Sequence, residues 1–185
     1  MRRSRFGLQK PSPNPARRKV PVSFDVRPHK MQTPPPLHSR IDLACEQLET
    51  AITIFSTDGS YISALTLAGA AEEIFGYEIK NRGQTNAVTR RYEQRVRAHA
   101  IAKFKPPSFS QLKEKMNYAR NAAKHIADKD DKRYVYDEFF RADPKESAKS
   151  MILRAMQNQE ILGLPRSPEA RRFYAWYLST IYSGE

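Results

Sequence analysis

The sequence predicts an all-α protein, and three observations support this prediction. Apolar residues recur at spacings of three and four through successive segments. No segment alternates apolar and polar residues over the length of a strand. Helix-start signals such as Ser or Asp-Pro and helix-end signals such as Gly separate the segments. We expect a helical bundle of about five to six helices with an up-and-down core over residues 37–185.

The composition is that of a soluble chain. The mean hydropathy is -0.71 and 39% of residues are hydrophobic. No apolar run approaches the roughly 20 residues needed to cross a bilayer, so we expect a cytoplasmic protein without membrane contact. The single cysteine, Cys45, excludes an intrachain disulfide and cysteine-rich zinc sites. Its helical apolar position predicts a small buried residue.

The net charge of +12 is unevenly distributed. Residues 1–36 contain nine Lys or Arg, one acid and eight of the thirteen prolines, which predicts a disordered basic arm. This arm either contacts phosphates of a nucleic acid or partner, or is a flexible extension, or precedes a true start at Met31. Residues 37–185 contain 23 basic and 19 acidic residues, so the folded part is only mildly basic.

Two helices are expected first, over residues 38–57 and 60–79. Asp58-Gly59 ends the first helix, with Gly59 suited to the left-handed position after the helix. Ser60 can cap the second helix. Because the connection is short, these helices should be antiparallel neighbours. The apolar stripe of the first helix contains Ile41, Ala44 or Cys45, Leu48, Ile52 and Phe55.

The second helix is rich in small residues, which predicts close approach of another backbone. These residues are Ala64, Ala68, Gly69, Ala70 and Ala71. Glycine costs about 1 kcal/mol of helix propensity compared with alanine, so tight packing is a reason to keep it. Glu72 and Glu73 follow, either as a solvated pair or with one of them paired to an arginine of the central helix.

A loop over residues 81–89 and a basic helical segment over residues 90–104 come next. Its modest apolar stripe contains Tyr92, Val96, Ala100 and Phe104. Lys105-Pro106-Pro107 should break this segment, because proline removes a helical donor. Ser108 or Ser110 can then cap the central helix.

The central helix is predicted over residues 110–131. Its apolar stripe consists of Leu112, Met116, Ala119, Ala123 and Ile126. At about 100° per residue, Asn121 and His125 fall on the opposite side. Asn117 is expected on the polar side too, and Arg120 at the border of the stripe. One face can therefore enter a core while the other presents polar side chains.

The C-terminal part continues the helical pattern. Residues 128–132 form a charged turn without the pattern of a calcium loop, and residues 134–140 are of ambiguous type. Asp143-Pro144 starts a helix whose apolar positions are Met151 or Ile152, Ala155, Met156 and Ile161 or Leu162. Gly163 ends it, and Ser167-Pro168 starts the last helix. Its aromatic stripe belongs to the core or to a dimer surface, or alternatively forms a base-stacking platform.

The residues with the clearest chemical potential are Arg120, Asn121 and His125, which have the form R-x4-H with Asn after the Arg. A histidine can act as acid or base near neutral pH, and an arginine can hold a phosphate bidentately. The chain has no P-loop, dinucleotide-binding, nucleophile-elbow or H-E-x-x-H motif. We expect neither a metal nor a cofactor.

This motif resembles that of the HEPN superfamily of helical domains, whose RNase members carry R-x4-6-H near the end of a helix. The stretch LTLAGAAEEIFG over residues 65–76 also resembles the second helix of a group of small bacterial proteins. In that group a later helix reads R-N-x-x-K-H, as this chain does from Arg120 to His125. The resemblance is best over residues 38–127.

The resemblance implies a homodimer in which the R-x4-6-H helices meet across the two-fold axis. It implies metal-independent RNA cleavage by the RNA's own 2′-OH. Arg120 would then hold the phosphate, His125 would move protons and Asn121 would orient the imidazole.

In the same interpretation, Lys124 and Asn117 would contact nucleic acid and Glu72 and Glu73 would support the site. Partners would be RNA and a cognate antitoxin or nucleotidyltransferase-type protein. The alternatives are a non-catalytic module that binds nucleotide, nucleic acid or protein, and a structural role in which Glu72 or Glu73 pairs with Arg120 and His125.

Overall fold

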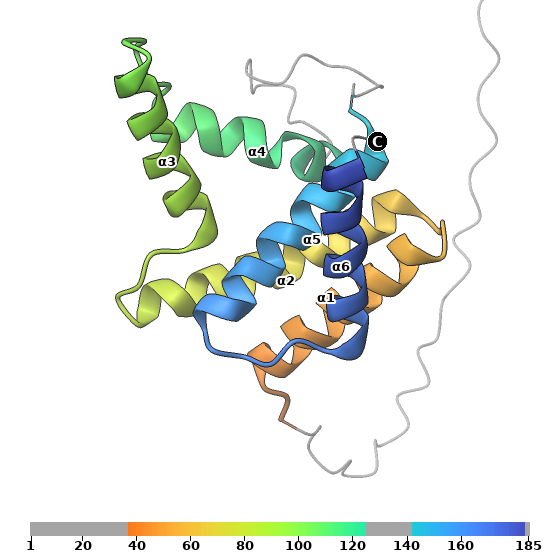
Figure 1. The fold of residues 1–185 in the computed structure, drawn as a ribbon. Helices are drawn as coiled ribbons and strands as arrows, with labels where there is room; N and C mark the ends of the chain where they lie inside the picture. Colours follow the sequence, from red (N-terminus) through yellow and green to blue (C-terminus); the bar gives the residue numbers. More distant parts are fainter. Residues whose placement is uncertain (1–36, 125–141, 184–185) are drawn as a thin grey trace, which may run out of the picture. The chain divides into compact units, whose positions relative to one another are not determined.

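The computed structural model describes residues 37–124 and 142–183. These residues form six α-helices and no strand, which confirms the all-α prediction (Figure 1). The helices are α1 (Arg40–Ser56), α2 (Tyr61–Asn81), α3 (Ala87–Ile101), α4 (Phe109–Lys124), α5 (Pro144–Ile161) and α6 (Pro168–Ser183). None of the helices in these ranges is long and apolar enough to cross a membrane. The arm over residues 1–36 and the segments over residues 128–132 and 134–140 lie outside the described residues.

Side-chain caps start the helices where the sequence indicates them. The Ser60 hydroxyl accepts a hydrogen bond from the Ser63 amide, and the Asp143 carboxylate accepts bonds at the start of α5. Pro144 takes the first helical position, as predicted. The predicted start of α3 is three residues late, because the Asn86 side chain caps the helix there.

The end of α1 differs in one detail from the prediction. Asp58, not Gly59, has the left-handed backbone, with a φ of 49°. The Gly59 amide donates to the Ile54 carbonyl and the Asp58 amide to the Phe55 carbonyl, which is the Schellman pattern. Aspartate tolerates the left-handed region better than most side chains, so Gly59 is free to make the outer of the two bonds.

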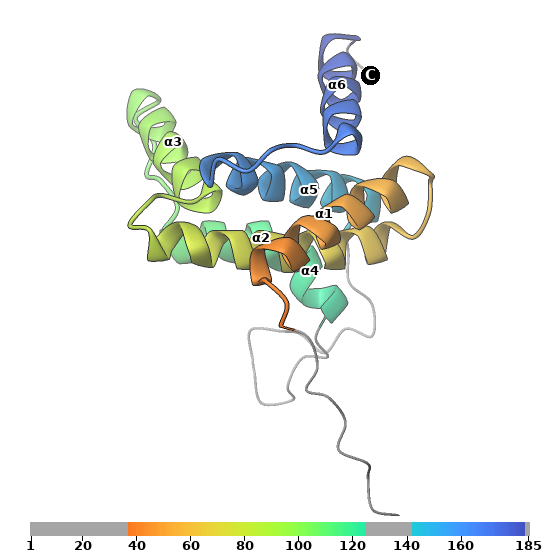
Figure 2. The ribbon, with the colours of Figure 1, turned by 90° about the horizontal axis from the view of Figure 1, so that it is seen from below.

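The core is formed by α1, α2 and α5, which lie side by side (Figure 2). As predicted, α1 and α2 are antiparallel neighbours. However, α5 runs in the same direction as α2, since Lys145 lies over the Tyr61 ring and Asn158 lies against Gly76. The core is therefore not purely up-and-down. A long excursion of the chain separates α2 from α5, so no short connection requires an antiparallel pair.

The other three helices contact the core with only part of their length. In α3 only Ala87 and Val88 are buried, and Phe104 of the predicted stripe is 69% exposed. In α6 the aromatic stripe is divided, with Phe173 packed edge-on against Phe55 and Tyr182 exposed. Figure 2 shows α6 projecting at a steep angle from the layer of core helices, and its first half contacts α1. Cys45 packs at the core edge and is half-buried, and burial raises the pKa of its thiol.

Candidate functional site

The small-residue face of α2 receives a long side chain. A Cβ built on Gly69 would lie 2.4 Å from the Cδ atom of Arg120 in α4. Only glycine leaves room for the Arg120 stem here, and the guanidinium Nη1 donates to the Gly69 carbonyl at 3.4 Å. The sequence predicted close approach of a backbone at this face. At Gly69 the close approach is instead made by an arginine side chain.

Both glutamates of α2 lie near this arginine. The Arg120 Nη1 atom is 3.8 Å from the Glu72 Oε2 atom and 3.7 Å from the Glu73 Oε2 atom. The predicted pairing of a glutamate with an arginine of the central helix is therefore confirmed. The Glu73 side chain is 62% exposed, whereas that of Glu72 is only 8% exposed. Glu72 is therefore the ionic partner that matters inside the protein.

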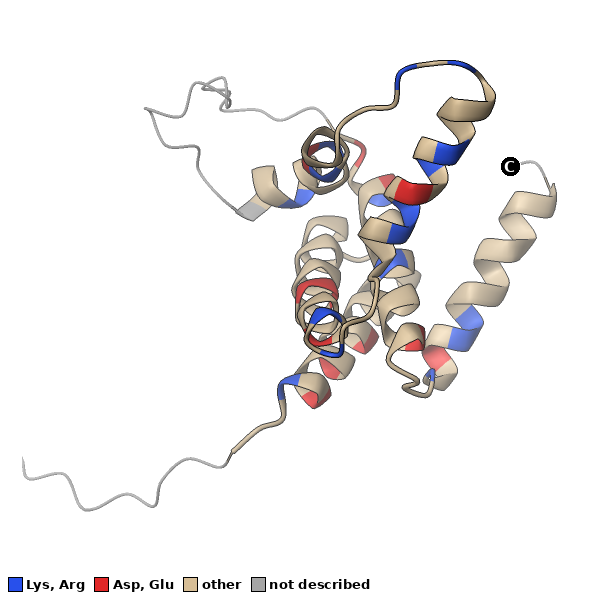
Figure 3. Ribbon diagram, turned by 90° about the vertical axis from the view of Figure 1, so that its left-hand side faces the viewer, with Lys and Arg blue, Asp and Glu red and all other residues tan. Residues whose placement is uncertain are grey.

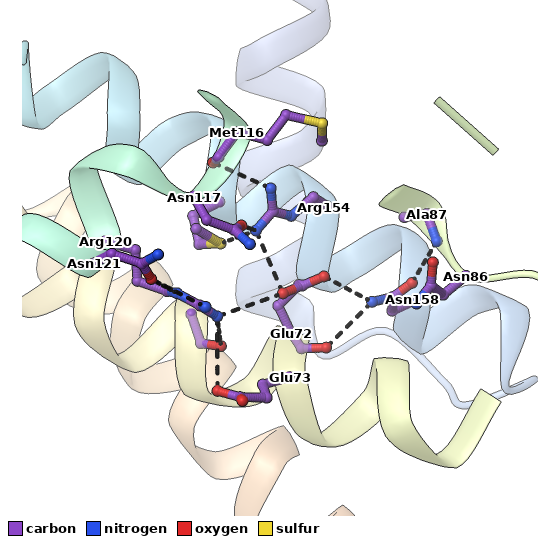
Figure 4. A network of polar contacts seen from close by, with 12 residues as sticks. Glu72, Glu73, Asn86, Ala87, Met116, Asn117, Arg120, Asn121, Arg154 and Asn158 are labelled. Atoms are coloured by element: carbon purple, nitrogen blue, oxygen red, sulfur yellow. Dashed lines mark hydrogen bonds and ion pairs between the residues drawn. The ribbon is translucent and has the colours of Figure 1, made fainter. Parts of the chain in front are cut away.

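A second arginine, Arg154 of α5, approaches Glu72 from the other side (Figure 4). It is 5% exposed, and its Nη2 atom donates to Glu72 Oε2 at 3.3 Å and to Asn117 Oδ1 at 2.6 Å. Its Nη1 atom donates to the Met116 carbonyl at 3.3 Å. This side chain therefore holds α2, α4 and α5 together. Arg154 was not among the site residues predicted from the sequence.

Asn158, one turn after Arg154, completes the network. It is fully buried, and its Nδ2 atom lies 3.3 Å from the Glu72 carbonyl oxygen and 3.5 Å from the Glu72 Oε1 atom. Its Oδ1 atom accepts a hydrogen bond from the Ala87 amide at 2.8 Å. The sequence does contain a signal for this pair, because Arg154 and Asn158 continue the row of Met151 at helical spacing.

The prediction that Asn117 lies on the polar side of the central helix is wrong. Asn117 is 6% exposed, and its Oδ1 atom is the closest acceptor for Arg154. A helical wheel with one apolar face assumes one neighbour, but α4 contacts both α2 and α5. At Asn117, a position that looks polar in the sequence is therefore buried against Arg154 of α5.

The other predicted site residues divide into two groups. Asn121 is half-buried, and its Oδ1 atom lies 3.4 Å and 3.3 Å from the Nε and Nη2 atoms of Arg120. It therefore orients the arginine. The Lys124 side chain and the whole of His125 lie outside the described residues. The assignment of proton transfer to His125 stays a prediction.

The network brings two arginines close to one buried carboxylate. Among the described residues, Glu72 is the one acid with a buried side chain, and Arg154 and Arg120 both lie close to it, while the exposed Glu73 also pairs with Arg120. Burial lowers the pKa of Arg154, Glu72 opposes this shift, and Arg120 and Arg91 add to it. An arginine stays protonated in proteins, so Arg154 remains a buried cation with Glu72 as its carboxylate partner.

A pocket of about 370 Å³ adjoins this network between α3, α4 and α5. Its basic lining residues are Arg91, Arg95, Lys115, Arg120 and Arg154, and its acidic ones are Asp143 and Glu146. Guanidinium groups bind carboxylates and phosphates through paired hydrogen bonds. This arrangement can therefore bind an oxyanion. In the described ranges no group of three or more His, Cys, Asp or Glu could hold a metal ion.

No family model, curated protein or solved structure matches the chain significantly. What is shown is an all-helical domain with a buried Glu72–Arg154 network and an adjoining basic pocket.

Proposed function

We propose that this protein is a HEPN-like RNA-binding domain that contacts RNA through its α3–α4 segment, residues 87–124. The observation that carries the proposal is the charge of this segment. It contains ten Lys or Arg and two acids, a net charge of +8. Residues 37–86, which form α1 and α2, contain three basic and seven acidic residues, a net charge of -4. The mild overall charge of the folded part therefore hides a strongly basic segment.

The packing of α3 supports the same conclusion. Figure 3 views the molecule from the side of α3, and Lys and Arg recur along this helix and the loop that follows. Only Ala87 and Val88 of α3 are buried, so most of its length contributes little to the core. A basic helix that is scarcely used for packing can give its charges to a polyanion. The choice of RNA over other polyanions follows from the HEPN resemblance.

The test is binding of a fluorescein-labelled single-stranded RNA, measured by fluorescence anisotropy at several salt concentrations. Arg97→Gln with Lys103→Gln removes two charges of the segment from exposed positions. If both contact phosphates, the slope of log K against log salt becomes less steep by about 1.4. Arg171→Gln is the matched control, because Arg171 is an exposed arginine of α6. A slope unchanged by the double substitution, or equally reduced by the control, would contradict the proposal.

RNA cleavage is the second candidate function, favoured by the position of Arg120 on the basic pocket. In this proposal Arg120 holds the scissile phosphate and His125 transfers protons, which is worth roughly 10² to 10⁴ in rate. Incubation of RNA in EDTA with wild type and His125→Ala at matched folding tests it. Equal cleavage by the two proteins rules out His125 as the acid or base. Arg120 already pairs with Glu72 and Glu73, which favours RNA binding over RNA cleavage as the function.

A further inference from the structure

We infer that the pocket between α3, α4 and α5 is a binding site for a phosphomonoester group. The idea that this phosphate is the end of an RNA rests on the proposed RNA binding. The binding of a phosphomonoester by the pocket does not depend on it. The inference depends on three features of the pocket: the charge of its walls, an unpartnered buried donor and its size.

The walls carry an excess of positive charge that the nearby acids do not cancel. Five basic side chains line the pocket, against Asp143 and Glu146. The Asp143 carboxylate caps α5 by accepting from the Lys145 and Glu146 amides. The Glu146 carboxylate lies 2.6 Å from the Lys149 ammonium. Both acids are therefore engaged elsewhere. Arg120 and Arg154 pair with Glu72 and Glu73 of α2, so an anion entering the pocket meets Arg91, Arg95 and Lys115 as its first cations.

Arg154 provides an unpartnered donor at the pocket. Its side chain is 5% exposed, and its Nε atom is buried without a hydrogen-bond partner. A buried donor without a partner lowers the stability of a protein, and the cost is greater for a charged group. The same guanidinium shares Glu72 with Arg120, which also pairs with the more exposed Glu73. The Nε atom has almost no surface open to the pocket, so an oxyanion bonds to it when the guanidinium turns toward the pocket, and the bond supplies the missing acceptor.

The size and the number of cations favour a monoester over an internal phosphodiester. A phosphomonoester carries a charge of about -1.5 to -2 at neutral pH and three strong acceptor oxygens. A phosphodiester carries one charge and must continue in two directions. A pocket of about 370 Å³ is near the small end of ligand sites, and it can hold a terminal phosphate with the sugar attached to it.

The first experiment uses inorganic phosphate alone and does not depend on RNA. Thermal unfolding is followed in phosphate and in sodium chloride at equal ionic strength, for wild type, Arg95→Gln and Arg97→Gln. Arg95 and Arg97 are exposed residues of α3, but only Arg95 lines the pocket. Wild type and Arg97→Gln should be stabilised in proportion to the logarithm of phosphate concentration. Arg95→Gln should require about tenfold more phosphate for the same shift.

The second experiment compares RNA ends. Decamers of one sequence are prepared with a 5′-phosphate, a 3′-phosphate or hydroxyls at both ends, and their affinities are measured. Either the 5′-phosphorylated or the 3′-phosphorylated decamer should bind wild type about tenfold more tightly than the decamer with hydroxyls at both ends. Arg97→Gln should weaken all decamers by the same factor and keep this preference. Arg95→Gln should abolish the preference.

The outcomes separate this inference from the proposed function. Specific stabilisation by phosphate without an end preference supports the site and identifies a free phosphomonoester as its ligand. Phosphate stabilisation without any RNA binding supports the site and overturns the proposed function alone. Equal stabilisation of wild type and Arg95→Gln, or no phosphate effect and no end preference, overturns the inference even if RNA binds.

Discussion

At the scale of single residues, Arg154 connects three helices from a buried position on the mostly apolar face of α5. Arg154 donates hydrogen bonds to side chains or carbonyls from α2 and α4 while it belongs to α5. A buried ion pair is not by itself strong support for stability, because both charges lose their hydration. Loss of either partner nevertheless destabilises the protein, because the other partner is then left charged, buried and unpaired.

Arg154→Met should therefore lower the free energy of unfolding by about 3 kcal/mol, because Glu72 loses its nearest cation in the interior. In the double variant Glu72→Gln with Arg154→Met, no buried carboxylate is left unpaired at this position, so part of the loss should be recovered. Urea unfolding of the four proteins in this cycle measures the coupling. Additive effects of the two substitutions would show that the pair does not act as a unit.

At the scale of elements, the contact of α2 with α4 depends on a glycine. Arg120 crosses α2 at Gly69, and a Cβ there would lie 2.9 Å from the Arg120 Cγ atom as well as 2.4 Å from the Cδ atom. The carboxylates of Glu72 and Glu73 hold the far end of this side chain. The arginine is therefore unable to move aside without losing these partners.

Gly69→Ala is expected to lower the stability of wild type by about 1 kcal/mol, since the clash outweighs the gain in helix propensity. In an Arg120→Ala background the clash is gone, so the same change should raise stability by about 1 kcal/mol. Thermal or urea unfolding in the two backgrounds measures the sign. The same sign in both backgrounds would refute the packing role assigned to Gly69.

At the scale of the whole molecule, the HEPN resemblance predicts a homodimer in which the α4 helices meet. Tyr118 is 42% exposed on α4, and such an interface would cover it. We expect sedimentation of wild type as a dimer of two 21.3 kDa chains, and of Tyr118→Glu as a monomer. Tyr77→Glu is the control, because Tyr77 is an exposed aromatic residue of α2. A monomeric wild type at micromolar concentration would contradict this prediction.

Much of the helix pattern could be predicted from local chemistry. Ser60 and Asp143-Pro144 start helices because a cap satisfies amides within one turn, which requires no other part of the chain. The pairing of an α2 glutamate with Arg120 could also be foreseen as an alternative, since charged residues beside small ones need a partner. The start of α3 could not be predicted as well, because the Asn86 cap falls within the predicted loop over residues 81–89.

The burial of Asn117 and the role of Arg154 could not be predicted in this way. The pattern of one helix shows which residues share a face, but not how many neighbours cover the helix. Asn117 is buried because α4 contacts α5 as well as α2. Arg154 finds its side-chain partners 37 and 82 positions away in the chain, which no local pattern records.

The sequence by itself determined the all-α class, most of the helix starts and the basic character of residues 90–104, because each depends on neighbouring residues or on composition. Only the tertiary structure decided that Arg120 and Arg154 share Glu72, and that a basic pocket adjoins them. The physical reason is that burial and the excess of charge are properties of side chains brought together from different helices. They arise when α4 and α5 both pack against α2.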